Sequence, residues 1–160
     1  MPFVTPTLPA VGDQITAAQG VVLANDLIAL GTRTVTKNTT ASTTFSTGTH
    51  ICDAPAVMGN ATNQFKISFT YLGVGSTVNG DTIQLQIRNG AGTVLQAINI
   101  TTLSGTGTGI TSGGSFFAVD VPASGSMVYS LIAVRLFGTG TCNIYAAATA
   151  PATLIVEQVG

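Results

Sequence analysis

The sequence predicts an all-β protein: a jelly-roll-like β-sandwich preceded by an extended N-terminal arm and one short α-helix. Between residues 65 and 159, six runs of about six to ten residues carry apolar side chains at alternate positions. Such alternation is typical of strands that bury one face and expose the other. Gly, Asn, Ser or Pro bounds each run, and no strand–helix alternation typical of a parallel sheet is present.

The clearest runs are residues 65–71 and 82–88, which we expect to form a hairpin across the turn-rich segment 74–81. Two strands with one apolar face are not stable alone in water, so a second sheet has to cover them. The side chains expected in the core are Phe65, Ile67, Phe69, Ile83, Leu85 and Ile87.

The remaining strands are shorter or less regular. Residues 33–37 and 43–46 lie in a Thr-rich stretch and are expected as edge strands, followed by an irregular connection at 50–63. Residues 127–137 are apolar on both faces, which predicts the longest strand in a central position. Further strands are expected at 93–100, after the turn signal at 89–92, and at 116–121, 141–148 and 153–159, with a glycine-rich loop at 103–115 and a turn at 122–126.

Two segments before residue 32 are expected to serve assembly. Prolines at positions 2, 6 and 9 make residues 1–10 an extended arm that cannot join a central strand. A capping-box pattern at Thr16 and a C-cap glycine at Gly31 predict a helix over 17–30. Its two apolar stripes indicate either contact on two sides or full burial within one chain. We therefore divide the chain into an anchoring segment, 1–31, and a sandwich domain, 32–160, with anchoring residues Phe3, Val4, Leu8, Leu23, Leu27 and Leu30.

Charged residues are scarce. They make up 7% of the chain, the formal net charge is −1, and the mean hydropathy is +0.49; ordinary soluble domains carry about 25% charged residues. A neutral surface suits a chain covered by copies of itself, so we expect a homotrimer. Five Lys and Arg residues form no basic stripe for nucleic acid, and no apolar run is long enough for a membrane helix. No secretory signal is recognisable at the start.

No motif indicates catalysis, since the acidic residues show no paired spacing and no Gly-x-Ser-x-Gly elbow accompanies the single histidine. His50, Cys52 and Asp53 carry metal-ligand atoms, but a zinc site needs more ligands, which three copies of His50 meeting at an axis would supply. The favoured interpretation is a connecting loop with a hydrogen-bonded His50. Asp81 is either a calcium ligand or a turn residue. Cys52 and Cys142 either pair or lie as two buried thiols, which the missing signal favours. We expect no catalytic residue, metal site or cofactor.

Two regions carry a family resemblance. The first is the proline-rich opening 3–9, followed by Gly12-Asp13-Gln14-Ile15-Thr16-Ala17-Ala18 and Asn25-Asp26-Leu27. The second comprises 130–135, 138–141 and 148–160. The first resembles the start of small virion proteins of tailed phages. The second is similar to the last strands of phage decoration and minor tail proteins, whose jelly roll is like that of tumour necrosis factor or C1q and usually trimeric.

The resemblance implies a non-enzymatic virion structural protein. In this interpretation the chain is a trimeric capsid decoration (cement) protein, assembled in the host cytoplasm, whose partners are itself and the major capsid protein or other virion proteins. The alternative is a tail-associated minor tail protein or a receptor- or glycan-binding module of the virion, which the absence of Trp disfavours. A secreted C1q-like ligand is disfavoured by the missing secretory signal.

Overall fold

A computed structural model describes residues 34–38, 42–59, 61–102 and 109–159, and these residues form strands and their connections, with no helix among them. The predicted arm, the predicted helix and all six predicted anchoring residues lie outside the described residues. The division at residue 31 and the anchoring roles therefore stay predictions.

Sheet A is built around one long strand, β5, which has a neighbour along each edge. On one edge β5 pairs with β8, and on the other it pairs with β12 and β11, which lie end to end. The outermost strands are β1 beside β12 and β2 beside β11. The bounds are β1 Thr34–Asn38, β2 Ser42–Phe45, β5 Phe65–Ser76, β8 Gly109–Asp120, β11 Cys142–Tyr145 and β12 Ala152–Gln158.

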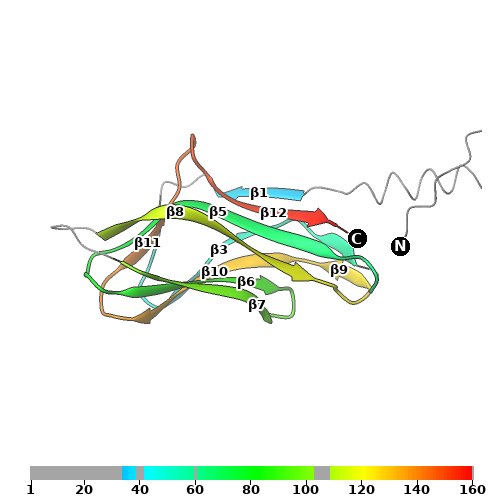
Figure 1. Ribbon diagram of the computed structural model, residues 1–160, viewed down its shortest axis with the longest axis horizontal. Helices are drawn as coiled ribbons and strands as arrows, with labels where there is room; N and C mark the ends of the chain where they lie inside the picture. Colours follow the sequence, from blue (N-terminus) through cyan, green and yellow to red (C-terminus); the bar gives the residue numbers. More distant parts are fainter. Residues whose placement is uncertain (1–33, 39–41, 60, 103–108, 160) are drawn as a thin grey trace, which may run out of the picture.

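Sheet B lies against sheet A, and Figure 1 shows the two as an upper layer with β1, β12, β5 and β8 and a lower layer with β3, β10, β6 and β7. All its pairings are antiparallel, in the order β3 (Gly48–Asp53), β10 (Tyr129–Phe137), β6 (Thr82–Asn89), β7 (Val94–Thr101). A small third sheet pairs β4 (Val57–Gly59) with β9 (Gly125–Met127).

The strand order is that of a jelly roll. If β1 with β2, and β11 with β12, count as two interrupted long strands, each main sheet has four members, and the first and last strands of the chain are neighbours in sheet A. Successive strands then alternate between the sheets, except that β6 and β7 are neighbours in sheet B, in the manner of two Greek keys. The predicted all-β sandwich is therefore confirmed for the described residues.

The core lies between the two sheets, where the inward side chains of β5 and β6 meet. The six predicted core residues are all buried, and five of them have no exposed surface. Burying a side chain of this size stabilises the fold by about 1.5–3 kcal/mol. Tyr129 of β10 is also fully buried, and its Oη donates to Asp120 Oδ2 at 2.9 Å. Burial, together with this bond and the charge of Asp120, raises the pKa of Tyr129.

The predicted hairpin over residues 65–88 is wrong, because β5 and β6 belong to different sheets. Two strands that each have one apolar face bury those faces equally well side by side under a second sheet or face to face across a core. Local alternation does not distinguish the two arrangements. The connection between β5 and β6 crosses from one sheet to the other instead of folding the strands into one ladder. By contrast, β6 and β7 do form a hairpin, with Gly92 at φ 83° in its turn.

Two predicted loops are partly strand. The segment 103–115 was expected as a loop because of its glycines, but β8 begins at Gly109. Gly113 lies so close to β5 that an added Cβ would be 2.3 Å from the carbonyl oxygen of Tyr71. Here glycine permits close approach of two strands and does not end one. The segment 50–63 was expected to be irregular, but β3 continues to Asp53 and β4 follows it.

The strand at 127–137 is central but not the longest. β10 lies between β3 and β6, as its two apolar faces predict, but it has 9 residues, whereas β5 and β8 have 12 each. The strand starts later than predicted because Met127 belongs to β9, where it pairs with Val57 of β4.

Candidate functional site

The outward face of sheet A carries exposed apolar side chains. On β8, Ala118 is buried, so the odd-numbered neighbours point outwards, and Phe117 and Val119 are 56% and 47% exposed. Val121, just after the strand, and Leu72 on β5 are about equally exposed. We call Leu72, Phe117, Val119 and Val121 the apolar face. A patch of this kind on a soluble domain marks an interaction site when its members are contiguous.

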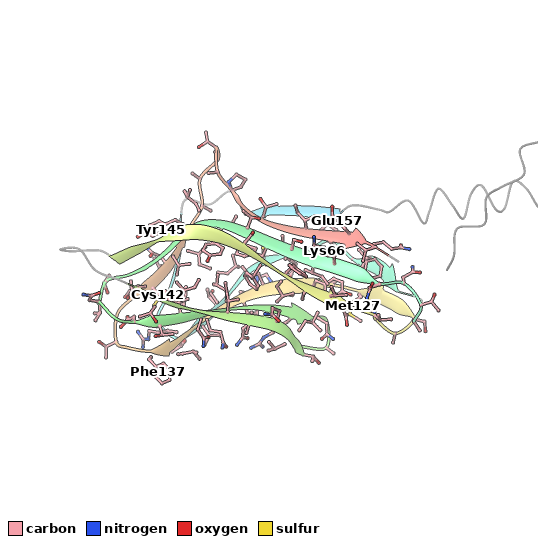
Figure 2. All side chains as sticks on the ribbon, viewed as in Figure 1. Lys66, Met127, Phe137, Cys142, Tyr145 and Glu157 are labelled. Atoms are coloured by element: carbon pink, nitrogen blue, oxygen red, sulfur yellow. The ribbon has the colours of Figure 1, made fainter. Side chains whose placement is uncertain are left out.

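Few charges interrupt the apolar face. Lys66 on β5 lies opposite Val119, and its Nζ is 5.2 Å from the centre of the Phe117 ring, a cation–π contact. Glu157 on β12 lies opposite Lys66, and Figure 2 shows both on the outer side of this sheet. Among the described outward positions of β5, β8 and β12, these two carry the charged side chains. The partner that covers this face therefore meets apolar and hydroxyl side chains with little charge.

An open groove of about 610 Å³ runs beside the apolar face, between the edges of the two sheets. Residues 115–119 of β8 form one wall, and Leu95 and Gln96 of β7 form the other. Within the described part of the chain, β8 pairs only with β5 and β7 only with β6. The outer edge of β8 therefore offers unpaired backbone N–H and C=O groups, the feature that attracts a further strand.

The outward side of β6 in sheet B is polar, although its neighbour β10 carries Ile132, Val134 and Leu136 outward. Gln84 Nε2 donates to Asn99 Oδ1 at 2.9 Å, Gln86 Nε2 donates to Gln84 Oε1, and Arg88 Nε donates to Gln86 Oε1 at 2.8 Å. We call Arg88, Gln86, Gln84 and Asn99 the polar ladder. Each side chain of the ladder donates to the next one, from Arg88 to Asn99, so each hydrogen bond polarises its neighbour. The ladder satisfies much of its own hydrogen-bonding capacity.

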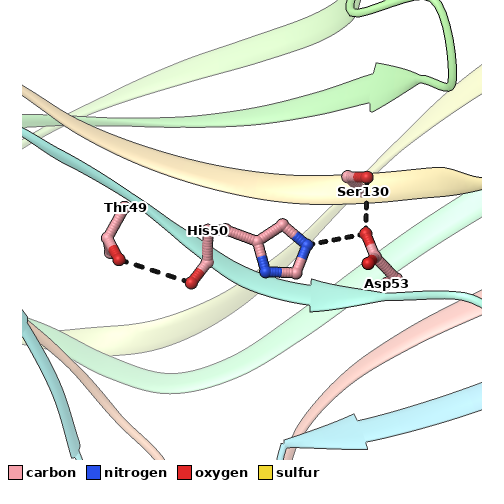
Figure 3. A network of polar contacts seen from close by, with 4 residues as sticks. All are labelled: Thr49, His50, Asp53 and Ser130. Atoms are coloured by element: carbon pink, nitrogen blue, oxygen red, sulfur yellow. Dashed lines mark hydrogen bonds and ion pairs between the residues drawn. The ribbon is translucent and has the colours of Figure 1, made fainter.

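A β-bulge brings His50 and Asp53 to the same side of sheet B. β3 pairs Cys52 with Leu131 and His50 with Ile132, so Ile51 is an extra residue. Ile51 and Cys52 are both buried, while His50 and Asp53 are exposed. Figure 3 shows the result: His50 Nε2 and Ser130 Oγ both donate to Asp53 Oδ1, each at 2.6 Å.

This cluster lacks the geometry of a catalytic triad. In a triad the histidine lies between carboxylate and nucleophile, whereas here the carboxylate lies between histidine and hydroxyl. Burial is the largest single influence and raises the pKa of Asp53, but the bonds from Ser130 and His50 and the charge of His50 together outweigh it and lower this pKa. A weakly basic carboxylate does not deprotonate serine. Cys52 faces the core, and no three His, Cys, Asp or Glu side chains gather as a metal site within the described ranges.

Asp81 is a structural turn residue at one end of the sandwich. It is 1% exposed, and its carboxylate accepts bonds from Ser76 Oγ at 2.6 Å, Gly140 N at 2.9 Å and Thr139 N at 3.2 Å. These bonds tie the β5–β6 connection to the β10–β11 turn. An added Cβ at Gly138, where φ is 105°, would be 1.7 Å from Asp81 Oδ1. The turn interpretation of Asp81 is confirmed.

The two cysteines are free and buried. Burial, with a smaller contribution from the charge of Asp53, raises the pKa of the Cys52 thiol to about 12. Burial also raises the pKa of Cys142. The interpretation as two buried thiols is therefore confirmed, and both are poor nucleophiles because the thiolate is the reactive form.

The sequence-based site list missed the apolar face. The residues 116–121, Phe-Phe-Ala-Val-Asp-Val, place apolar side chains at both even and odd positions, which indicates a strand that is covered on both faces.

Inside the described ranges, no helix is long and apolar enough to span a membrane.

Comparisons with known proteins give a fold-level likeness at low similarity. No protein-family model and no curated protein matches the sequence. The VP2 capsid protein in an infectious bursal disease virus subviral particle is 13% identical, with a TM-score of 0.41 over 80% of this chain and 37% of that chain. The carbohydrate-binding module TmCBM61, bound to β-1,4-galactotriose, is 10% identical, with a TM-score of 0.33 over 76% and 86%. The enzymatically active domain of tailspike protein 4 of bacteriophage CBA120 is 13% identical, with a TM-score of 0.31 over 81% and 19%. This chain thus spans little more than a third of the capsid chain, and at these values the likeness assigns no function.

Proposed function

We propose that this chain is a non-enzymatic structural subunit of a tailed-phage virion, a homotrimeric capsid decoration protein that binds the major capsid protein or its neighbours in the head. The observation that carries the proposal is the exposed apolar face on sheet A, beside the unpaired edge of β8. Apolar surface left in water costs about 25 cal/mol per Å², so exposed side chains such as Phe117 and Val119 favour association.

The scarcity of charge supports the same conclusion. With a net charge of −1 and 7% charged residues, electrostatic repulsion between copies is weak, which favours close packing of subunits in a particle. The anchoring segment 1–31 supplies the tether in this proposal, with residues 1–14 lying on a neighbouring subunit. The polar clusters support a role without catalysis, because Asp53 and Asp81 are both held by structural hydrogen bonds.

Sedimentation velocity of the full chain at micromolar concentration tests the assembly. We expect a trimer, and we expect the double variant Phe117→Ser, Val119→Ser to shift it toward monomer. The matched control is Phe137→Ser, because Phe137 is 69% exposed and lies opposite Thr82 in sheet B. A monomeric wild type would contradict the trimer, and a stronger effect of Phe137→Ser would move the interface to sheet B.

Mass spectrometry of separated heads and tails tests the location. A decoration protein is recovered with heads at a copy number comparable to that of the major capsid protein. Recovery with tails alone would favour the second candidate below, and recovery with neither would contradict a virion protein.

A glycan-binding tail module is the second candidate, and one observation favours it. Phe137 is highly exposed beside Thr82 and Thr101, whose hydroxyl oxygens are 3.3 Å apart, and the polar ladder continues along β6 from this point. An exposed ring beside hydroxyl and amide groups suits the stacking and hydrogen bonding of a sugar. Figure 2 shows Phe137 projecting away from the sheet.

Ligand-observed NMR with β-1,4-galactotriose, maltotriose and cellotriose tests this candidate. Binding that disappears in Phe137→Ala but persists in Phe117→Ala would support a sugar site on sheet B. No signal with any of the three, or signals that both variants retain, would leave the assembly proposal in place and contradict this site.

A further inference from the structure

The shape and chemistry of the groove beside β8 favour one kind of occupant, an extended peptide. Its floor is partly buried apolar surface, because Phe116 and Leu95 pack against the core without being covered. Its rim is the free edge of a strand. An extended peptide that adds to such an edge gains main-chain hydrogen bonds, and alternate side chains choose the partner.

We propose that residues 2–8 of a neighbouring copy of this chain add to the outer edge of β8 as an extra strand. This inference rests on the proposed function as an oligomeric subunit and names the surface on which the arm docks. The segment Pro2-Phe3-Val4-Thr5-Pro6-Thr7-Leu8 lies outside the described residues, and its sequence fits the edge in three respects.

The first respect is the position of the prolines. Both backbone groups of a strand residue point to the same neighbour, and successive residues point to opposite edges. Pro2 and Pro6 are both even-numbered, so one edge of the segment keeps the N–H groups of Phe3, Thr5 and Thr7. That edge pairs with β8. The opposite edge lacks donors at the prolines and resists addition of a further strand, and Pro9 ends the pairing.

The second respect is chemical. The even-numbered side chains Val4, Pro6 and Leu8 share one apolar face of the segment, while Thr5 and Thr7 lie on the other with Phe3. No residue between 2 and 8 is charged, which matches a receptor bordered by Phe117 and Val119.

The third respect is topological. The described chain enters the sandwich at Thr34 in β1, which pairs with Val156, and β1 and β8 lie at opposite edges of sheet A. The described chain thus begins at one edge of sheet A, and the proposed receptor lies at the other. A head-to-tail interface of this kind generates a ring, such as a trimer, when the rotation between copies closes. The 25 residues from 9 to 33 span up to about 80 Å when extended, which is long enough for residues 2–8 to reach β8 of a neighbouring copy.

A pair of proline substitutions in the full chain tests the pairing. Thr5→Pro removes an N–H that points to β8, whereas Val4→Pro removes one that points away and keeps an apolar side chain. Sedimentation equilibrium should show association weakened about tenfold or more by Thr5→Pro and little changed by Val4→Pro. Unchanged far-UV circular dichroism in both variants confirms that the sandwich remains folded.

Equal association of the two variants, or equal loss, overturns the edge pairing. If the wild type is a trimer that neither variant weakens, the docking inference fails while the trimeric proposal stands. If the wild type is a monomer, both fail.

Photo-cross-linking tests the location and the copy. With p-benzoylphenylalanine in place of Phe3 and a mixture of ¹⁵N-labelled and unlabelled chains, cross-links should join unlike chains and fall within residues 115–119 or at Leu95 and Gln96. Cross-links confined to single chains, or to other strands, overturn the inference even if the trimer is confirmed.

Discussion

The two outward faces of the sandwich differ although they enclose one core. On sheet A, Phe117, Val119 and Leu72 are about half exposed. On sheet B, the corresponding positions of β6 carry Gln84, Gln86 and Arg88, which bond to one another. The polar side chains of β6 bind each other and water, so this strand gains little from being covered, although Leu136 on neighbouring β10 is exposed. The apolar side chains on sheet A form no such bonds, so covering them is favourable because it removes apolar surface from water.

The largest effect is expected at neighbouring phenylalanines on the two sides of sheet A. Phe69 has no exposed surface, and it pairs with Phe116, next to Phe117. Phe69→Ala should lower the free energy of unfolding by about 3–5 kcal/mol, because it leaves a cavity. Phe117→Ala should change the stability of the isolated subunit by about 0.5 kcal/mol or less. Urea unfolding of both variants measures the contrast, and equal losses would mean that Phe117 is part of the core.

Asp81 tests whether the two sheets are held together at one end. Asp81→Ala should cost about 3 kcal/mol, because buried donors from Ser76, Thr139 and Gly140 lose their acceptor. Asp81→Asn keeps one acceptor oxygen and should cost less. Thermal unfolding followed by circular dichroism gives both values. An Asn variant as unstable as the Ala variant would show that the negative charge matters and the bonds do not.

The polar ladder should contribute less. Gln86 is 8% exposed and links Gln84 to Arg88, so Gln86→Ala should cost about 1 kcal/mol through its lost bonds. Gln96→Ala on the exposed edge strand serves as control and should have little effect. If neither substitution changes the free energy of unfolding in urea, water replaces the bonds of the ladder equally well, and the ladder does not stabilise the fold.

The smallest effect is a pH dependence at Asp53. Its pKa is lowered from 3.8 in the folded protein, so its contribution to stability is present above the unfolded value. That contribution is lost as the pH falls through the lower folded value. The effect is small because the pair with His50 is half exposed. Urea midpoints between about pH 5 and pH 2 should fall more steeply in the wild type than in Asp53→Asn, and parallel curves would contradict the assignment.

Which side chains of β5 and β6 face inwards follows from the period of two, and all six predicted core residues are buried. The partner of each strand does not follow, which is why the hairpin at 65–88 was wrong. The glycines of 103–115 predicted a loop for a similar reason. Gly113 in fact allows β8 to approach Tyr71 of β5 closely, and the local sequence does not contain that neighbour. Of the candidate site, the sequence shows the uncharged character and the apolar run at 116–121, but the position of Leu72 beside that run depends on the pairing of β5 with β8.

The sequence by itself determined the fold class, the inward faces and the neutral surface, because these follow from properties of consecutive residues. Alternation, turn residues and charge content are all local or additive quantities. The tertiary structure alone decided the strand order, the bulge that brings His50 beside Asp53, and the exposure of Phe117 next to a free edge. These depend on contacts between segments far apart in the chain, such as Asp81 with Gly140. The alternation of apolar and polar residues along a strand does not encode such contacts, because several strand pairings bury the same apolar faces equally well.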